Sequence, residues 1–215
     1  MNIFFLSFIV AEAARDHIDV HVVKMILETA QLLFSVHYAV DSTELKTRQQ
    51  NNLKVYRKTH SNHPSAIWVR TSIEHYWWLS ELGLALCSEY TRRYKKVHST
   101  EELLQWLYDN VPDLPDIPFS YPPQAMPDVY KNDDCVTAYR QYYVGAKSKL
   151  GRFGYKDGYL PDWWEEIKEK VDKLDIPEET TKEKKKSIQC LGNTKSGERC
   201  KNKCVTGYCH LHTIN

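Results

Sequence analysis

The sequence lacks a global excess of charge of either sign, since 29 basic and 28 acidic residues leave a net charge of +1. It also lacks a disulfide framework: four of the six cysteines lie in the last 26 residues, and Cys87 and Cys135 stand alone. This cysteine usage is typical of a reducing compartment. Beyond the apolar start at residues 2–10, no run is long and apolar enough to cross a bilayer. We therefore expect an intracellular protein with no membrane partner.

The apolar start itself has two explanations. Residues 2–10 followed by Ala11 resemble a short signal peptide, but they lack the basic region that begins such peptides. A buried strand or extended core segment that leads into a helix explains the same pattern. We favour this second interpretation, and we predict that the protein is not secreted.

The chain is long enough for one main domain and a small appendage. Its 14 tyrosines and 6 tryptophans indicate a sizeable core, and we find no internal repeat. The sequence predicts a mainly α, compact helical domain over residues 1–164. A charged linker or helix is expected over 165–187, and a small metal-binding module over 188–215.

Local signals predict the elements of the main domain. A stretch without Gly or Pro predicts one long helix over 12–38, and the polar residues 41–61 predict a flexible loop. Pro64 suits the first turn of a second helix that runs to about Tyr94. Ser99 and Glu102 form the pattern of a capping box for a third helix, which ends near Asn110. A proline-rich ordered loop is expected over 111–128, and a short helix over 134–149.

A polar stripe is predicted along the first helix. Its members are spaced so that they fall on one face, and they are His17, His21, Lys24, Glu28, Gln31 and Ser35. The stripe fits a solvent-facing edge with an ordinary Lys24–Glu28 pair, a metal site through His17 and His21, or an acid/base cleft centred on Glu28. The cleft is favoured because other functional residue types are available elsewhere in the sequence: His60, Asn62, His63, Arg70, Gln124, Tyr139, Arg140 and Tyr143. Each of these also has a structural explanation, such as helix capping, ion pairing or core packing.

The C-terminal segment predicts a structural zinc site. Three thiolates and one imidazole form a tetrahedral ligand set, and we predict that these are Cys190, Cys200, Cys209 and His212. So few apolar residues cannot stabilise a fold without a metal. Cys204 and His210 are alternative ligands, and a disordered basic tail with incidental cysteines is the alternative to the site as a whole.

Positive charge is concentrated beside this segment. Eight basic and two acidic residues lie between Lys182 and Lys203, a local charge of +6. This concentration favours contact with nucleic-acid phosphates over a merely solvated linker. The phosphate contacts are expected from Lys185, Lys186, Lys195 and Lys201.

Three stretches of the main domain follow one another in a characteristic order: Asp19-Val-His21-Val-Val-Lys-Met-Ile-Leu-Glu28, His63-Pro-Ser65-Ala-Ile-Trp68-Val-Arg70 and Tyr139-Arg-Gln-Tyr142-Tyr143-Val-Gly145. Through these stretches, residues 1–164 resemble the phage pyrimidine-dimer DNA glycosylases of the endonuclease V type. The C-terminal segment is similar to a small Cys/Cys/Cys-His module found in phage and giant-virus proteins. Together they imply a viral protein that works in the infected host cell or the virion.

The resemblance implies a DNA glycosylase and AP lyase that acts on pyrimidine dimers through an amine nucleophile. Glu28 matches the family's catalytic glutamate, Asn2 occupies the place of its nucleophile, and Lys24 is an alternative amine, with His21 as the fourth catalytic candidate. The candidates for binding DNA in this domain are His17, His63, Arg70, Gln124, Tyr139 and Arg140.

Two other functions fit the same residues. One is a non-catalytic nucleic-acid-binding or virion protein that retains the fold. The other is an enzyme on a nucleobase or nucleotide, which uses the polar stripe with Arg70 and Arg140 as phosphate clamps. Protein partners are not indicated by any sequence feature.

Overall fold

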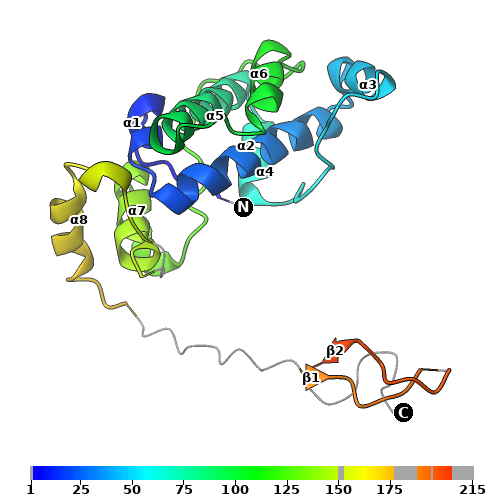
Figure 1. The fold of residues 1–215 in the computed structure, drawn as a ribbon. Coiled ribbons are helices and arrows are strands. Elements are labelled where there is room, and N and C mark those ends of the chain that lie inside the picture. Colours follow the sequence, from blue (N-terminus) through cyan, green and yellow to red (C-terminus); the bar gives the residue numbers. More distant parts are fainter. Residues whose placement is uncertain (1, 150–152, 177–187, 195, 205–215) are drawn as a thin grey trace. The chain divides into compact units, whose positions relative to one another are not determined.

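The computed structural model describes residues 2–149, 153–176, 188–194 and 196–204. The chain divides into two compact units, Met1–Asp175 and Ile176–Asn215, and each is described by itself (Figure 1). The first unit is helical, which confirms the predicted mainly α class. Its helices are α1 (Val10–Arg15), α2 (Asp19–Ala39), α3 (Thr43–Gln50), α4 (Pro64–Val69), α5 (Ile73–Tyr94), α6 (Glu101–Asp109), α7 (Cys135–Tyr142) and α8 (Trp164–Val171).

The N-terminal segment is extended and buried, as predicted for a core segment. Ile3, Phe4, Phe5 and Leu6 are each at most 5% exposed. Segments far along the chain hold its backbone, since Trp78 Nε1 donates a hydrogen bond to the carbonyl of Phe8 and the Arg140 guanidinium donates one to that of Leu6. These bonds replace the ladder that a strand would form.

The predicted helix over 12–38 is wrong in one respect, because it is broken into α1 and α2. At the break, the Asp16 carboxylate accepts hydrogen bonds from Tyr159 OH and Trp163 Nε1. The Ile18 N–H donates to Tyr143 OH, 2.8 Å away. Tyr143 thus satisfies a backbone N–H that a continuous helix would satisfy itself, and no local sequence signal predicts these long-range partners.

The predicted flexible loop over 41–61 contains a helix. Ser42 caps α3 by accepting a hydrogen bond from the Leu45 N–H, and the Leu45 side chain is buried. The second predicted helix begins where expected, with His63 as N-cap and Pro64 in the first turn. It is interrupted after α4, because Ser72 caps a new helix, α5.

The third helix is α6, as predicted, but the side chain of its N-cap, Thr100, makes no capping hydrogen bond, because its hydroxyl pairs with Tyr56 OH. A proline-rich segment then leads through a 3₁₀ turn, Asp128–Tyr130, to α7. A π-helical turn, Tyr143–Lys147, continues α7, and a second 3₁₀ turn, Lys156–Gly158, precedes α8.

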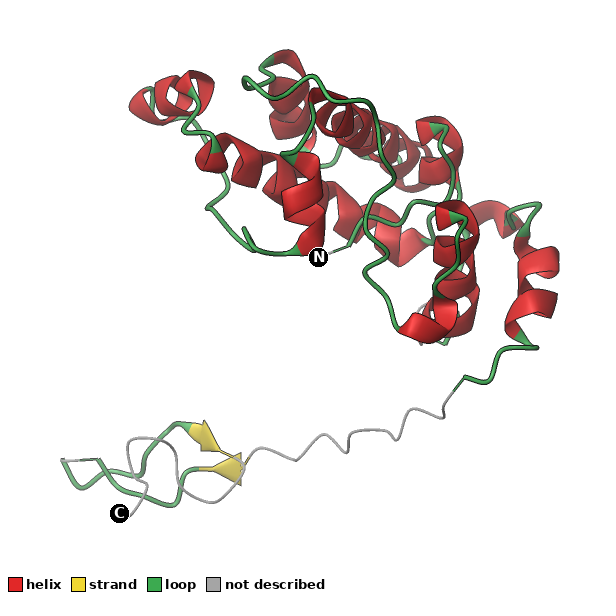
Figure 2. Cartoon of the chain, turned by 180° about the vertical axis from the view of Figure 1, so that it is seen from behind, coloured by secondary structure: helices red, strands yellow, loops and turns green. Residues whose placement is uncertain are grey.

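The two long helices form the centre of the first unit (Figure 2). α2 and α5 pack against each other so closely that a Cβ on Gly83 would lie 2.9 Å from Thr29 Cγ2. α8 buries Trp164, Ile167 and Val171, and it contacts α7. The first unit therefore extends past the expected boundary at residue 164. None of the described helices combines the length and the apolar character that a membrane span requires.

The second unit contains a short antiparallel pair of strands. β1 (Ile188–Gln189) pairs with β2 (Lys203–Cys204). The segment that connects the two strands contains Cys190 and Cys200, and both side chains are buried. An isolated bridge joins Asn193 to Arg199. The described part of this unit is therefore a small hairpin-like fold.

Candidate active site on the second helix

The middle of α2 carries a half-hidden carboxylate next to an exposed amine. The Glu28 side chain is 15% exposed, and Lys24, one turn earlier, is 65% exposed. Lys24 Nζ lies 3.2 Å from Glu28 Oε1. A carboxylate with restricted access to water, within reach of an amine, can exchange a proton with it.

His63 lies near this pair at the start of α4. Its Nδ1 accepts a hydrogen bond from the Ser65 N–H at 3.2 Å, so the neutral ring carries its proton on Nε2. Burial lowers the pKa of His63, the charges of the chain's α-amino group and of His60 lower it further, and the charge of Glu28 raises it. His63 is therefore within electrostatic reach of both the α-amino group and Glu28.

The N-terminal end of the chain is fixed by the side chain of Asn2. Its amide donates a hydrogen bond to the carbonyl of Ala125 at 3.1 Å, and its oxygen accepts bonds from the Ile3 N–H and from Tyr139 OH. The described start of the chain is therefore held against the proline-rich segment and α7.

The two histidines of the predicted stripe are in the core. His21 is 6% exposed, stacks on Phe4 at 4.5 Å, and shares a hydrogen bond of 2.9 Å between its Nδ1 and Tyr143 OH. Burial lowers the pKa of His21 to about 3. Its neutral ring positions α2 against the N-terminal segment and is not available to solvent.

His17 is fully buried before α2 begins, and this corrects its expected contact with DNA. Its Nδ1 lies 2.6 Å from the carbonyl of Ala13, its Nε2 has no hydrogen-bond partner among the described residues, and burial lowers its pKa to about 4. In the described ranges, no three His, Cys, Asp or Glu side chains form a group able to hold a metal. The metal interpretation of His17 and His21 therefore has no support.

Four further candidates mainly hold the backbone in place. Arg70 donates to the carbonyl of Ser61, and Gln124 exchanges two hydrogen bonds with the backbone of Asn132. Tyr139 is fully buried and donates to the carbonyl of Pro123 at 2.7 Å. Arg140 lies over the Trp163 ring at 4.8 Å, and burial lowers its pKa. Tyr139 and Arg140 also hold the N-terminal segment, through Asn2 and the carbonyl of Leu6.

Cations near the site were missed in the sequence analysis. Arg57 and Lys58 are exposed on the segment that leads to His63, and Lys147 lies over the ring of Tyr142 at 4.4 Å. The signal for the first two is the absence of any acidic residue over positions 45–73, a stretch that contains six basic residues. Lys147 had no comparable signal, because its position depends on the π-helical turn.

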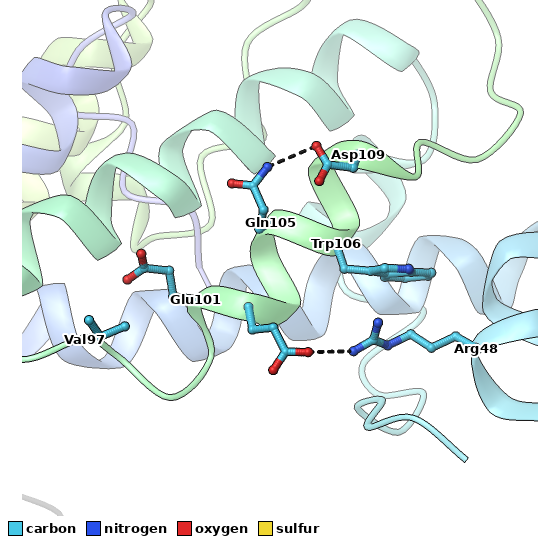
Figure 3. A pocket seen from close by; sticks show the side chains of 7 residues that line it. Arg48, Val97, Glu101, Gln105, Trp106 and Asp109 are labelled. Atoms are coloured by element: carbon cyan, nitrogen blue, oxygen red, sulfur yellow. Dashed lines mark hydrogen bonds and ion pairs between the residues drawn. The ribbon is translucent and has the colours of Figure 1, made fainter. Parts of the chain in front are cut away.

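A surface cavity of about 480 Å³ lies elsewhere, between α6 and Arg48 (Figure 3). Arg48 lies over the Trp106 ring at 4.8 Å and pairs with Glu102, while Gln105 donates a hydrogen bond to Asp109. Three acidic residues line this cavity, and none of the residues predicted from the sequence does. Its charge is unsuited to a phosphate ligand.

The described part of the second unit has two buried thiols. Cys190 is 0% and Cys200 is 4% exposed, and the Gly192 N–H donates to Cys190 Sγ at 3.4 Å. Backbone N–H groups that point at a sulfur stabilise a thiolate, so these two residues fit a zinc site. Lys201 is exposed. Cys209, His212, Lys185, Lys186 and Lys195 lie outside the described residues, as does the alternative ligand His210.

Comparisons with known proteins give no relative for this chain. No protein-family model, no curated protein and no solved structure matches it.

Proposed function

We propose that the protein is an intracellular DNA glycosylase and AP lyase that acts through an amine, with pyrimidine dimers as its expected lesion. The observation that carries the proposal is the 3.2 Å distance between Lys24 Nζ and the Glu28 carboxylate, whose side chain is 15% exposed. The α-amino group is the second candidate amine, because its charge and that of Glu28 both shift the pKa of His63. An α-amino group is partly neutral near pH 7, which a nucleophilic amine requires.

The proposed reaction begins when the neutral amine attacks C1′ of the deoxyribose. The bond from C1′ to the base breaks, and the base leaves with the bonding electron pair and takes up a proton. The C1′–O4′ bond then opens, O4′ takes up a proton, and C1′ and the amine nitrogen form a protonated imine. This imine acidifies the C2′ hydrogen, whose removal expels the 3′ phosphate by β-elimination, and water then hydrolyses the imine and releases the amine. We assign to Glu28 the transfer of protons from the amine and to the leaving group. A base in a duplex must first be extruded from the stack.

We also propose that the second unit holds one structural zinc ion. Cys190 and Cys200 supply two of the ligands, and Cys209 and His212 are the proposed others. The ion would stabilise a segment too small to fold by apolar burial alone. The basic residues around it, Lys201 among them, would add contacts to DNA phosphates.

Borohydride trapping tests the chemistry. The full chain is incubated with a duplex that contains one thymine dimer, or one abasic site, in the presence of borohydride. A covalent band on the dimer duplex is expected, and peptide mapping identifies whether the α-amino group or Lys24 is joined. Glu28→Gln should abolish the band, whereas Glu81→Gln, an exposed glutamate on α5, should leave it unchanged.

A non-catalytic nucleic-acid-binding protein is the second candidate, and the exposed cations beside the site favour it. This candidate predicts binding of DNA without any covalent band, and binding that is insensitive to Glu28→Gln. A band on the abasic duplex alone would limit the activity to lyase chemistry without dimer recognition.

A further inference from the structure

The segment over residues 53–62, which we call the basic strap, runs without helix or strand from the end of α3 to a turn just before α4 (Figure 1). We infer that the basic strap binds the phosphate backbone of a nucleic acid and guides it to Glu28. The second half of this inference rests on the proposed function.

Charge is the first observation. Positions 45–73 contain six basic residues and no acidic residue. Arg48 is used internally, and Lys46 pairs with Asp41. The cations left on the surface of the strap are Lys54, Arg57 and Lys58, and the last two form no ion pair with any described residue. The positive charges of Arg57 and Lys58 are therefore exposed to solvent, from which an anion can approach.

The strap is fastened to the helices along its length. At its start, the Arg48 side chain donates to the carbonyl of Lys54 at 2.9 Å. In its middle, Tyr56 OH pairs with Thr100 Oγ1, and its ring packs edge-on against Phe34.

Ser35 on α2 holds the end of the strap through two hydrogen bonds. Its hydroxyl donates to the carbonyl of Thr59 at 2.9 Å and accepts from the Thr59 N–H at 3.3 Å. Arg57 and Lys58 are exposed between these anchors, while Tyr56 and Thr59 are held against the body. Because Tyr56 and Thr59 are anchored, the segment between them loses less conformational entropy when a ligand binds to Arg57 and Lys58.

The length and direction of the strap fit a polyanion. A fully extended chain rises about 3.3 Å per residue, so Lys54 and Lys58 are at most roughly 13 Å apart along it. One strand of B-DNA carries a charge every 3.4 Å or so, which gives about four phosphates over that distance. The strap reaches α2 at Thr59, which is bonded to Ser35, and Ser35 lies seven residues, or about 10 Å, after Glu28 on the same face of α2. A strand bound along the strap therefore has a nucleotide near the carboxylate.

The test compares Arg57→Glu/Lys58→Glu with Lys168→Glu/Lys173→Glu, which makes the same change of charge at α8 and the turn after it. Fluorescence anisotropy with the full chain measures affinity for an undamaged 20-base-pair duplex between 50 and 200 mM salt. The strap variant should bind at least about tenfold more weakly at 50 mM salt. Its log–log salt slope should be lower by about two, since each lost phosphate contact removes about 0.9.

Equal affinities of the strap variant and the wild type would overturn the inference, as would an equal loss in the α8 variant. Arg57→Gln/Lys58→Gln provides a milder change in case charge reversal disturbs folding, and tryptophan fluorescence checks the fold. Loss of binding to phosphatidylserine vesicles with unchanged binding to DNA would assign the strap to membranes and overturn it too. Failure of the proposed function is separate: absence of trapping in the wild type removes the chemistry and leaves the binding result intact.

Discussion

Lowering the pH from 7 to 5 should destabilise the helical unit strongly, because three histidines are buried in their neutral form. Burial lowers the pKa of His17 to about 4, that of His21 to about 3 and that of His37 to about 4. In an unfolded chain each has a pKa near 6.5. Between these values the unfolded state binds protons that the folded state does not, so stability falls as the pH falls.

The size of the effect follows from the shifts. A histidine whose pKa is 6.5 in the unfolded state and 4 in the folded state lowers the free energy of unfolding by about 2 kcal/mol when the pH falls from 7 to 5. Three such residues give about 5 kcal/mol, which is comparable with the entire stability of many domains. Asp16 acts in the opposite direction, because burial raises its pKa. Burial also lowers the pKa of His75, which adds to the loss.

Urea unfolding followed by tryptophan fluorescence measures this loss, since all six tryptophans lie in the helical unit. The free energy of unfolding at pH 7, 6, 5.5 and 5 should fall with a slope that approaches three protons. His37→Gln should reduce the slope by one proton, because it removes one titrating group from between Ser42 and Tyr76. A slope below one proton in the wild type would refute the assignment of these histidines as neutral core residues.

Two further changes have predictable effects. Gly83→Ala puts a methyl group within 3 Å of the side chains of Leu104 and Thr29. Despite alanine's higher helix propensity, this change should lower the free energy of unfolding by about 1–3 kcal/mol, which urea unfolding measures. Cys200→Ala should lower the zinc content from one ion per chain towards zero in metal analysis, whereas the buried Cys87→Ala should leave it unchanged, and equal zinc in both variants would contradict the proposed ligand.

Local signals were sufficient for most of the helices and insufficient for their breaks. His63 and Pro64 predicted the start of α4 because capping and first-turn preferences depend only on neighbouring residues. The break at Asp16 was not predictable in this way, because its hydrogen-bond partners, Tyr159 and Trp163, are more than 140 residues away. The short α3 was missed because its polar sequence resembles a loop, and only its Ser42 cap and one buried leucine indicate a helix.

The candidate site shows the same division. The spacing of Lys24 and Glu28 predicted their ion pair, since residues four apart share a helix face. The spacing of His17 and His21 indicated the same face, but His17 precedes α2 and both rings are buried. The break in the helix places His17 outside α2, and the N-terminal segment covers His21 by packing against it. The periodicity of the stripe predicts neither of these features.

The anchoring of the N-terminal segment has a consequence for the order of folding. Residues 2–8 leave the ribosome before their hydrogen-bond partners, which are Trp78, Ala125, Tyr139 and Arg140. Contacts of such large sequence separation form slowly, because a long loop must close before they contribute. The segment therefore docks completely only after α7 has been synthesised, and before its partners are available its four consecutive apolar residues, 3–6, are exposed to aggregation and to chaperones.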